Sequence, residues 1–130
     1  MAALRDIVVD CRRAAPLARF WAQVLDGSAI APYDEAERAR LRALGVDDVE
    51  DDPTVLLEGP TGAPRLWFQV VPEPRTVKNR VHLDLAAADV GAEVERLLAL
   101  GAVLHEPPSP GPDLVTLHDP EGNEFCIVAA

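Results

Sequence analysis

The stretch RVHLDLAAADVGAEVERLLALG, from Arg80 to Gly101, decides the fold. Polar and apolar side chains alternate over residues 80–87, which is the period of a half-buried β-strand. Asp89 then stands at the N-cap position of an apolar-striped helix over 90–100, and Gly101 follows where a left-handed C-cap residue is common. The sequence therefore predicts a strand followed directly by a helix that packs on it.

The first half of the chain repeats this order. Residues 4–11 alternate in the same way, and residues 14–25 have the apolar spacing of a helix. The apolar stripe of that helix is Leu17, Phe20, Trp21, Val24 and Leu25. Val8 lies 74 positions before His82, and the segments around these two residues show the same order of a strand followed by a helix. Because a half of about 60 residues buries too little surface to be stable alone, two such modules are expected to pack together.

The remaining segments complete each module. Short strands are predicted at 28–32, 54–57, 65–71, 102–105, 113–118 and 124–128. The composition of 33–44 predicts a further helix, and the acidic run 46–53 predicts a solvated loop. His105, beside prolines, is expected at the surface. These elements divide a single domain, 1–130, into modules of about 1–73 and 74–130.

The charge balance excludes several classes of partner. The 130 residues include 22 Asp and Glu against 12 Lys and Arg, a net charge of −10, which argues against binding to nucleic acid. No apolar run is long enough for a membrane span, and the N-terminus lacks the order of a signal peptide. We therefore expect no membrane association and a cytoplasmic location. The two cysteines, Cys11 and Cys126, are expected to be free thiols.

Three motifs carry a resemblance to a known superfamily: ARFW at 18–21, KNRVHLDL at 78–85 and DPEGNEF at 119–125. In this order they resemble the small bacterial glyoxalase-like domain proteins of the vicinal oxygen chelate superfamily, which also contains bleomycin-resistance proteins and extradiol dioxygenases. The resemblance implies an α+β fold of two βαβββ modules whose curved mixed sheets surround a cavity. One departure is Asp26-Gly27, where these proteins usually have Leu-Gly.

The resemblance also implies positions for a divalent metal site. They fall on Asp6, or Val8 in the other register, and on Gln69, His82 and Cys126. An amide and a thiol stand where the enzymes usually have His or Glu, and a hard divalent cation prefers carboxylates and other oxygen ligands. We therefore expect no catalytic metal and predict no cofactor. If a metal is bound, this set favours zinc held by His82, Cys126 and Asp6.

Five residues are predicted to contact a small molecule: Asp6, Trp67, Gln69, Arg80 and His82. Trp67 and Gln69 share a strand face, which places an aromatic surface beside a polar amide. Packing in the core or in a dimer is the other interpretation of Trp67. A hydrogen bond within the wall of a metal-free cavity is the other interpretation of His82. Arg80 belongs to the basic run 78–80, which is either an anion clamp at the cavity mouth or a solvated strand entry.

Three functions remain open at this level. The first is binding of a small organic molecule without a catalytic metal. The second is a metal-dependent lyase, isomerase or dioxygenase, and the third is a regulatory or structural module with a vestigial site. Members of the superfamily of this size usually pair, so a homodimer is expected.

Overall fold

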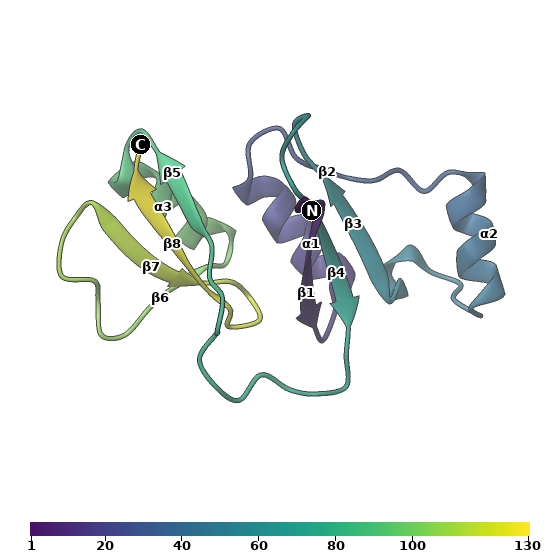
Figure 1. Cartoon of the computed structure of the whole chain (residues 1–130). Coiled ribbons are helices and arrows are strands. Elements are labelled where there is room, and N and C mark those ends of the chain that lie inside the picture. Colours follow the sequence, from purple (N-terminus) through teal and green to yellow (C-terminus); the bar gives the residue numbers. More distant parts are fainter. The chain divides into compact units, whose positions relative to one another are not determined.

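Each half of the chain folds into a mixed four-stranded sheet with a helix on one face (Figure 1). The computed structural model describes all 130 residues, which divide into the units Met1–Pro74 and Arg75–Ala130. The first unit contains β1 (Asp6–Cys11), α1 (Ala14–Val24), β2 (Ala29–Ile30), α2 (Glu35–Ala43), a 3-10 turn (Val49–Asp51), β3 (Thr54–Glu58) and β4 (Arg65–Val70). The second contains β5 (Asp84–Ala87), α3 (Val90–Leu100), β6 (Val103–Leu104), β7 (Leu114–His118) and β8 (Glu124–Ala129).

The two sheets have the same topology. Their strand orders are β1-β4-β3-β2 and β5-β8-β7-β6. In each sheet the first strand runs parallel to the last one, and the other neighbours are antiparallel. The α+β fold of two βαβββ modules is therefore confirmed, with α2 as an additional helix in the first.

The core of the first unit lies between α1 and one face of its sheet. The predicted stripe of α1 is buried at Leu17, Phe20, Trp21 and Val24. The strands contribute Val55, Leu57, Leu66 and Phe68 to the same core. Burying each of these large side chains contributes about 1.5–3 kcal/mol, which explains why this face of the sheet is fixed.

The helix of the second unit begins and ends as its sequence predicts. The Asp89 side chain accepts a hydrogen bond from the Ala92 N–H at 3.0 Å, and Gly101 has φ +111°. Leu97 is the fully buried residue of α3, and it packs in the core with Leu117, Phe125 and Ile127. None of the helices is long and apolar enough to cross a membrane.

The prediction of a strand over 80–87 is wrong for its first half. β5 begins at Asp84, and Val81 is 77% exposed. The reason lies in Asn79, whose N–H donates to Glu124 Oε2 at 3.0 Å and whose side-chain amide donates to the Glu124 carbonyl at 3.3 Å. Because these bonds occupy the start of β8, backbone pairing with β5 begins only at Asp84 and Cys126.

The prediction that the acidic run 46–53 is a solvated loop is wrong at Asp52. This residue is 2% exposed. Its carboxylate accepts hydrogen bonds from the Tyr33 hydroxyl at 2.8 Å, from Arg40 at 3.0 Å and from the Thr54 N–H at 3.0 Å. Three donors, one of them charged, offset the cost of removing the carboxylate from water.

The helix predicted over 33–44 is confirmed as α2. It is capped by Asp34, whose side chain accepts a hydrogen bond from the Glu37 N–H at 2.9 Å.

Candidate functional site

The register between β1 and β4 gathers the predicted residues of the first unit on one sheet face. Asp6 lies opposite Arg65, Val8 opposite Trp67, and Asp10 opposite Gln69. We call this face, which is turned away from α1, the open face. It is formed by Asp6, Val8, Asp10, Thr54, Leu56, Arg65, Trp67 and Gln69. The structure therefore brings Asp6, Trp67 and Gln69 together on one surface.

Asp6 is held by two guanidinium groups. Arg65 donates to both of its oxygens, at 2.8 and 3.1 Å, and Arg5 donates at 3.0 Å. The hydrogen bond from Arg65 is the main cause that lowers the pKa of the Asp6 carboxyl. The carboxylate thus ties β1 to β4, and its oxygens are already occupied by donors.

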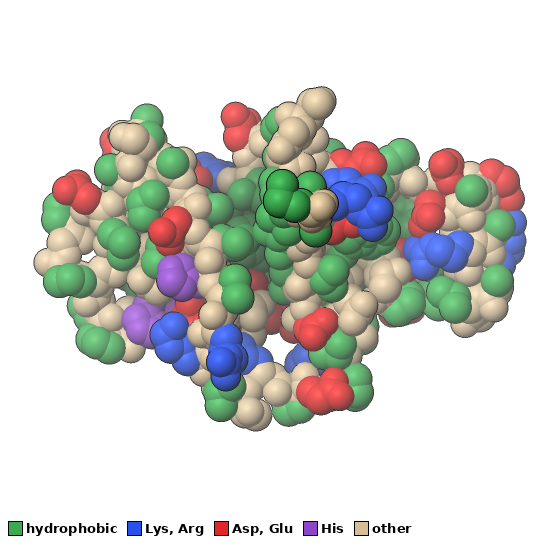
Figure 2. Space-filling view, in the orientation of Figure 1, with side chains coloured by type: hydrophobic (Ala, Val, Ile, Leu, Met, Phe, Trp, Pro, Cys, Tyr) green, Lys and Arg blue, Asp and Glu red, His purple; other side chains and the backbone are tan.

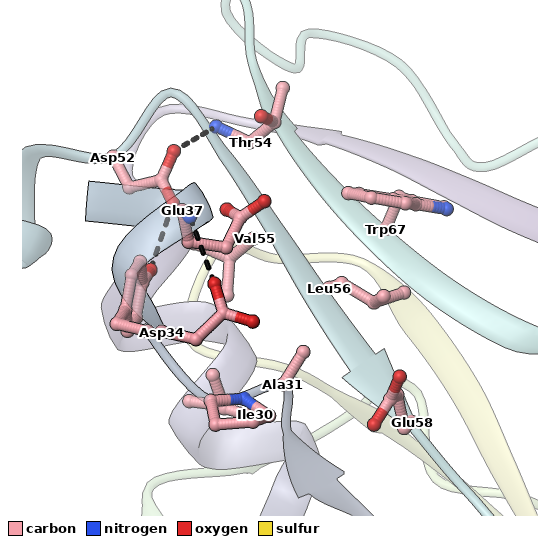
Figure 3. Close-up of a pocket in the computed structure, with 12 residues that line it drawn as sticks. Ile30, Ala31, Asp34, Glu37, Asp52, Thr54, Val55, Leu56, Glu58 and Trp67 are labelled. Atoms are coloured by element: carbon pink, nitrogen blue, oxygen red, sulfur yellow. Dashed lines mark hydrogen bonds between the residues drawn. The ribbon is translucent and has the colours of Figure 1, made fainter. Parts of the chain in front are cut away.

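Trp67 forms part of a pocket on the open face. It lies opposite Leu56 of β3, and the Arg65 guanidinium carbon is 5.9 Å from its ring centre. The pocket encloses about 290 Å³ and runs from these strands to the start of α2 (Figure 3). Its lining is Ile30, Ala31, Pro32, Tyr33, Asp34, Glu37, Asp52, Thr54, Val55, Leu56, Glu58 and Trp67. Gln69 is exposed outside it, with its amide 3.4 Å from Asp10.

The wall opposite Trp67 is a hydrogen-bonded network that the sequence did not reveal. Asp52 accepts from Tyr33 and Arg40, and Arg40 also donates to Glu37 at 2.8 and 3.0 Å. Burial, with the hydrogen bond to Asp52, raises the pKa of the Tyr33 hydroxyl well above its ordinary value. Tyr33 therefore stays a neutral donor, and the network holds α2 against β3. Asp52 gave no local signal, because its side-chain partners lie 12 and 19 residues away.

In the second unit, His82, Asp84 and Cys126 come together. One ligand atom from each lies within 4.8 Å of the others, and His82 Nε2 is 3.4 Å from Asp84 Oδ1. Asp84 pairs with Cys126 in the sheet, and Thr116 Oγ1 is 3.3 Å from the Cys126 sulfur. Asp84 thus forms one group with two of the predicted metal ligands, His82 and Cys126. The sequence offered a way to find Asp84, because residues two apart on a strand lie on the same face.

The chemistry of this group fits zinc. Imidazole nitrogen, carboxylate oxygen and thiolate sulfur are all ligands of zinc, and three protein ligands leave one position for water or a substrate. Ligand atoms around tetrahedral zinc are about 3.5 Å apart. His82 Nε2 and Asp84 Oδ1 are already 3.4 Å apart, so only their distances to the Cys126 sulfur have to close, by about 1 Å at most. His82 and Asp84 are exposed and have room to do so, whereas Cys126 is buried.

The first residues of α1 and α3 show which residue of the first unit corresponds to His82. Asp6 precedes Ala14, the first residue of α1, by eight residues, and His82 precedes Val90, the first residue of α3, by the same number. Asp6 and not Val8 therefore corresponds to His82. Asp6 lies inside β1, while His82 lies just before β5.

Arg80 is exposed and lies in the segment between β4 and β5, whose basic side chains are visible at the surface in Figure 2. Two other residues of this segment have structural partners in Glu124. Arg75 donates to Glu124 Oε1, and the Asn79 N–H donates to Glu124 Oε2. Burial opposes the charged form of Glu124, but the hydrogen bonds from Asn79 and Arg75 lower its pKa to about 2. This segment is therefore anchored by Glu124, and Arg80 projects from it.

His105 is not an isolated surface residue, contrary to expectation. Its ring stacks on His118 with centroids 5.0 Å apart, and His105 Nδ1 is 2.8 Å from His118 Nε2. The Gly122 carbonyl, 3.0 Å from His118 Nδ1, can only accept, so that nitrogen carries a proton. The pairing of β6 with β7 brings the two rings together, which sequence spacing alone does not show.

Comparisons with known proteins agree with this geometry. The sequence matches the model of a family described as a glyoxalase-like domain over residues 6–128, whereas a comparison with curated proteins found no match. One similar structure is a glyoxalase/bleomycin resistance protein/dioxygenase family enzyme from Burkholderia phytofirmans PsJN, with 20% identity, 97% of each chain covered and a TM-score of 0.65.

Two further similar structures are named for different activities. The fosfomycin resistance protein FosX from Mesorhizobium loti has 15% identity and a TM-score of 0.68, with 100% of this chain and 93% of that chain covered. The oxidase ChaP-H2 has 16% identity and a TM-score of 0.62, with 100% and 94% covered. At these identities the likeness shows the fold alone. Since the family model spans both units, from the first residue of β1 into β8, the chain belongs to the glyoxalase-like domain family.

Proposed function

We propose that this protein binds a small organic molecule on the open face of its first unit, without a catalytic metal. The observation that carries the proposal is the pocket of about 290 Å³ beside Trp67 and Leu56. Its volume is at the small end of known ligand sites, and it combines apolar side chains with a few fixed polar groups, as such sites do. The two units are proposed to act as one glyoxalase-like domain, since one family model covers both.

The residues of the open face have distinct roles in this proposal. Trp67 offers an aromatic surface to a flat or apolar ligand. Asp6 positions Arg65, which keeps the guanidinium beside the Trp67 ring. Tyr33 and Asp52 hold the opposite wall, so the pocket is formed before a ligand arrives, which lowers the entropic cost of binding. Gln69, His82 and Arg80 do not line this pocket. Their proposed contacts with a ligand rest only on the sequence-based prediction of their positions.

Tryptophan fluorescence tests the proposal. The chain has two tryptophans, and Trp21 is buried on the core-facing side of α1. Trp21→Phe therefore leaves Trp67 as the single reporter. A panel of small aromatic and aliphatic molecules should contain compounds that change this fluorescence and raise the unfolding temperature, because a ligand that binds only the folded state stabilises it. Trp67→Ala removes the reporter, so its effect is read from the unfolding temperature, which the same compounds should no longer raise while the protein stays folded. A panel that yields no binder would contradict the proposal.

A metal-dependent enzyme is the second candidate, and the group of His82, Asp84 and Cys126 favours it. A bound zinc ion would supply Lewis-acid polarisation or an activated water. His82 and Asp84 would bind as neutral imidazole and carboxylate, and Cys126 as thiolate, giving up its contact with Thr116. Titration with cobalt(II) tests this set, because a thiolate ligand produces a charge-transfer band that Cys126→Ser would remove.

A further inference from the structure

Four carboxylates line the pocket beside Trp67, and no lysine, arginine or histidine does. They belong to Asp34, Glu37, Asp52 and Glu58. The floor between them is apolar, formed by Leu56 and the Trp67 ring. The pocket therefore joins an aromatic surface to a negative electrostatic potential.

Only part of this negative charge is compensated within the protein. Both oxygens of Asp52 accept from donors within the chain, and Arg40 binds Asp52 and one oxygen of Glu37. The other oxygen of Glu37, the second oxygen of Asp34 and both oxygens of Glu58 accept no hydrogen bond from the chain. Three carboxylates thus keep acceptor capacity that faces the pocket.

Figure 3 shows how these groups are arranged. Asp34 and Glu37 lie on the α2 side, while Leu56, Glu58 and Trp67 lie on the strand side. A ligand lying across Trp67 therefore has carboxylates on both sides. Arg65, whose guanidinium carbon is 5.9 Å from the Trp67 ring, is hydrogen-bonded to Asp6 and also attracts Glu58 electrostatically, so it offsets only part of this charge.

We infer that the pocket binds an organic cation, a protonated amine carried on a flat or apolar group. An ammonium group gains from unpaired carboxylates and from the face of a tryptophan ring, the latter contributing about 0.5–2 kcal/mol. An anion is repelled by the same carboxylates, and a neutral ring uses only the apolar floor. A bare metal ion leaves Trp67 and Leu56 without a role. This inference rests on the proposed function and assigns its ligand class.

A matched set of ligands tests the inference in the Trp21→Phe protein. The set is phenethylamine, 2-phenylethanol and 3-phenylpropanoate, which share a ring and differ in charge. Phenethylamine should bind at least tenfold more tightly than the alcohol, and the carboxylate should bind most weakly. Added salt should weaken the binding of the amine and leave that of the alcohol unchanged.

Two substitutions locate the effect. Glu58→Gln and Asp34→Asn should each lower the affinity for the amine several-fold without changing that for the alcohol, and asparagine retains the capping role of Asp34. Glu73→Gln, an exposed carboxylate outside the pocket, is the matched control and should have no effect.

The outcomes separate the two levels of the proposal. Equal affinities for the three compounds, with loss of binding in Trp67→Ala, would overturn the cation inference and leave the proposed function standing. Stabilisation by calcium or magnesium, and not by the amine, would overturn the inference in favour of a metal-ion site. Failure of all three compounds and of the wider panel would overturn both.

Discussion

Arg65 binds the carboxylate of Asp6 from the neighbouring strand through two nitrogens, at 2.8 and 3.1 Å. The resemblance described above implies Asp6 as a metal ligand. In this chain its oxygens are occupied by guanidinium groups of Arg65 and Arg5. The pair fixes the register of β1 against β4 and keeps the charge of Arg65 neutralised beside Trp67.

The first prediction concerns this ion pair. Asp6→Asn should lower the unfolding temperature and also weaken the binding of a cationic ligand, because it leaves Arg65 uncompensated beside the pocket. Arg65→Met alone should leave cation binding intact or improved. In the Arg65→Met protein, Asp6→Asn should have a much smaller effect on unfolding, since the interaction is already lost. Additive effects of the two substitutions would show that the pair is not coupled.

The second prediction concerns Glu124, whose pKa is lowered to about 2 from an ordinary value of 4.5. A lowered pKa means that the ionised carboxylate stabilises the fold. This contribution is complete above pH 4.5 and is lost as the pH falls toward 2. Glu124→Gln should cost about 2 kcal/mol of unfolding free energy at neutral pH, because hydrogen bonds from Asn79 and Arg75 lose their charged acceptor. The same substitution should also make the unfolding free energy fall less steeply as the pH decreases from 4.5 toward 2, the acid limb of the stability curve.

Chemical denaturation from pH 7 to pH 2 measures both effects. Glu121→Gln is a useful control, because this carboxylate lies three residues earlier, and the bonds from Arg75 and Asn79 end on the carboxylate of Glu124. An acid limb that is unchanged in Glu124→Gln would contradict the prediction.

The third prediction uses Tyr33, the single tyrosine of the chain. Burial and its bond to Asp52 raise its pKa above the ordinary 10.0, so the hydroxyl stays neutral at pH 10 to 11 while the fold persists. This stabilisation is complete below pH 10 and is lost as the pH rises through the raised pKa. Ultraviolet absorbance should therefore show no phenolate until the first unit unfolds. A titration midpoint near 10.0 in the folded protein would contradict the network.

Removal of the same hydroxyl should be costly. Tyr33→Phe should destabilise the protein by about 1–3 kcal/mol, because it takes one donor from a buried carboxylate. The other donors to Asp52, Arg40 and the Thr54 N–H, remain.

The fourth prediction is that the purified protein carries no stoichiometric divalent metal. Asp6 is bound by arginines, Gln69 offers only an amide, and Cys126 is buried against Thr116. Elemental analysis after expression in metal-replete medium provides the measurement. One metal per chain, lost in His82→Ala, would instead support the enzyme candidate.

The fifth prediction is a homodimer. Val8 of β1 and Val103 and Leu104 of β6 are exposed apolar residues on strands at the edges of their sheets. Such edges favour pairing with a second chain. Light scattering at micromolar concentration should return twice the 14.0 kDa of one chain, and a particle of 14.0 kDa would reject the prediction.

The sequence by itself determined the elements whose causes are local. The cap at Asp89, the left-handed Gly101 and the apolar stripe of α1 each depend on residues within a few positions, and all three are present in the structure. The open face could also be predicted, because side chains alternate along a strand and their face follows from which positions are apolar.

Only the tertiary structure decided which polar groups meet. Asp52 became a buried acceptor because Tyr33 and Arg40 reach it from other elements, and His105 found His118 through the pairing of β6 with β7. Asp6 met an arginine 59 residues away. Burial makes each of these polar groups costly without a partner, and the partner is chosen by strand register and helix packing, which residue spacing in the chain does not encode.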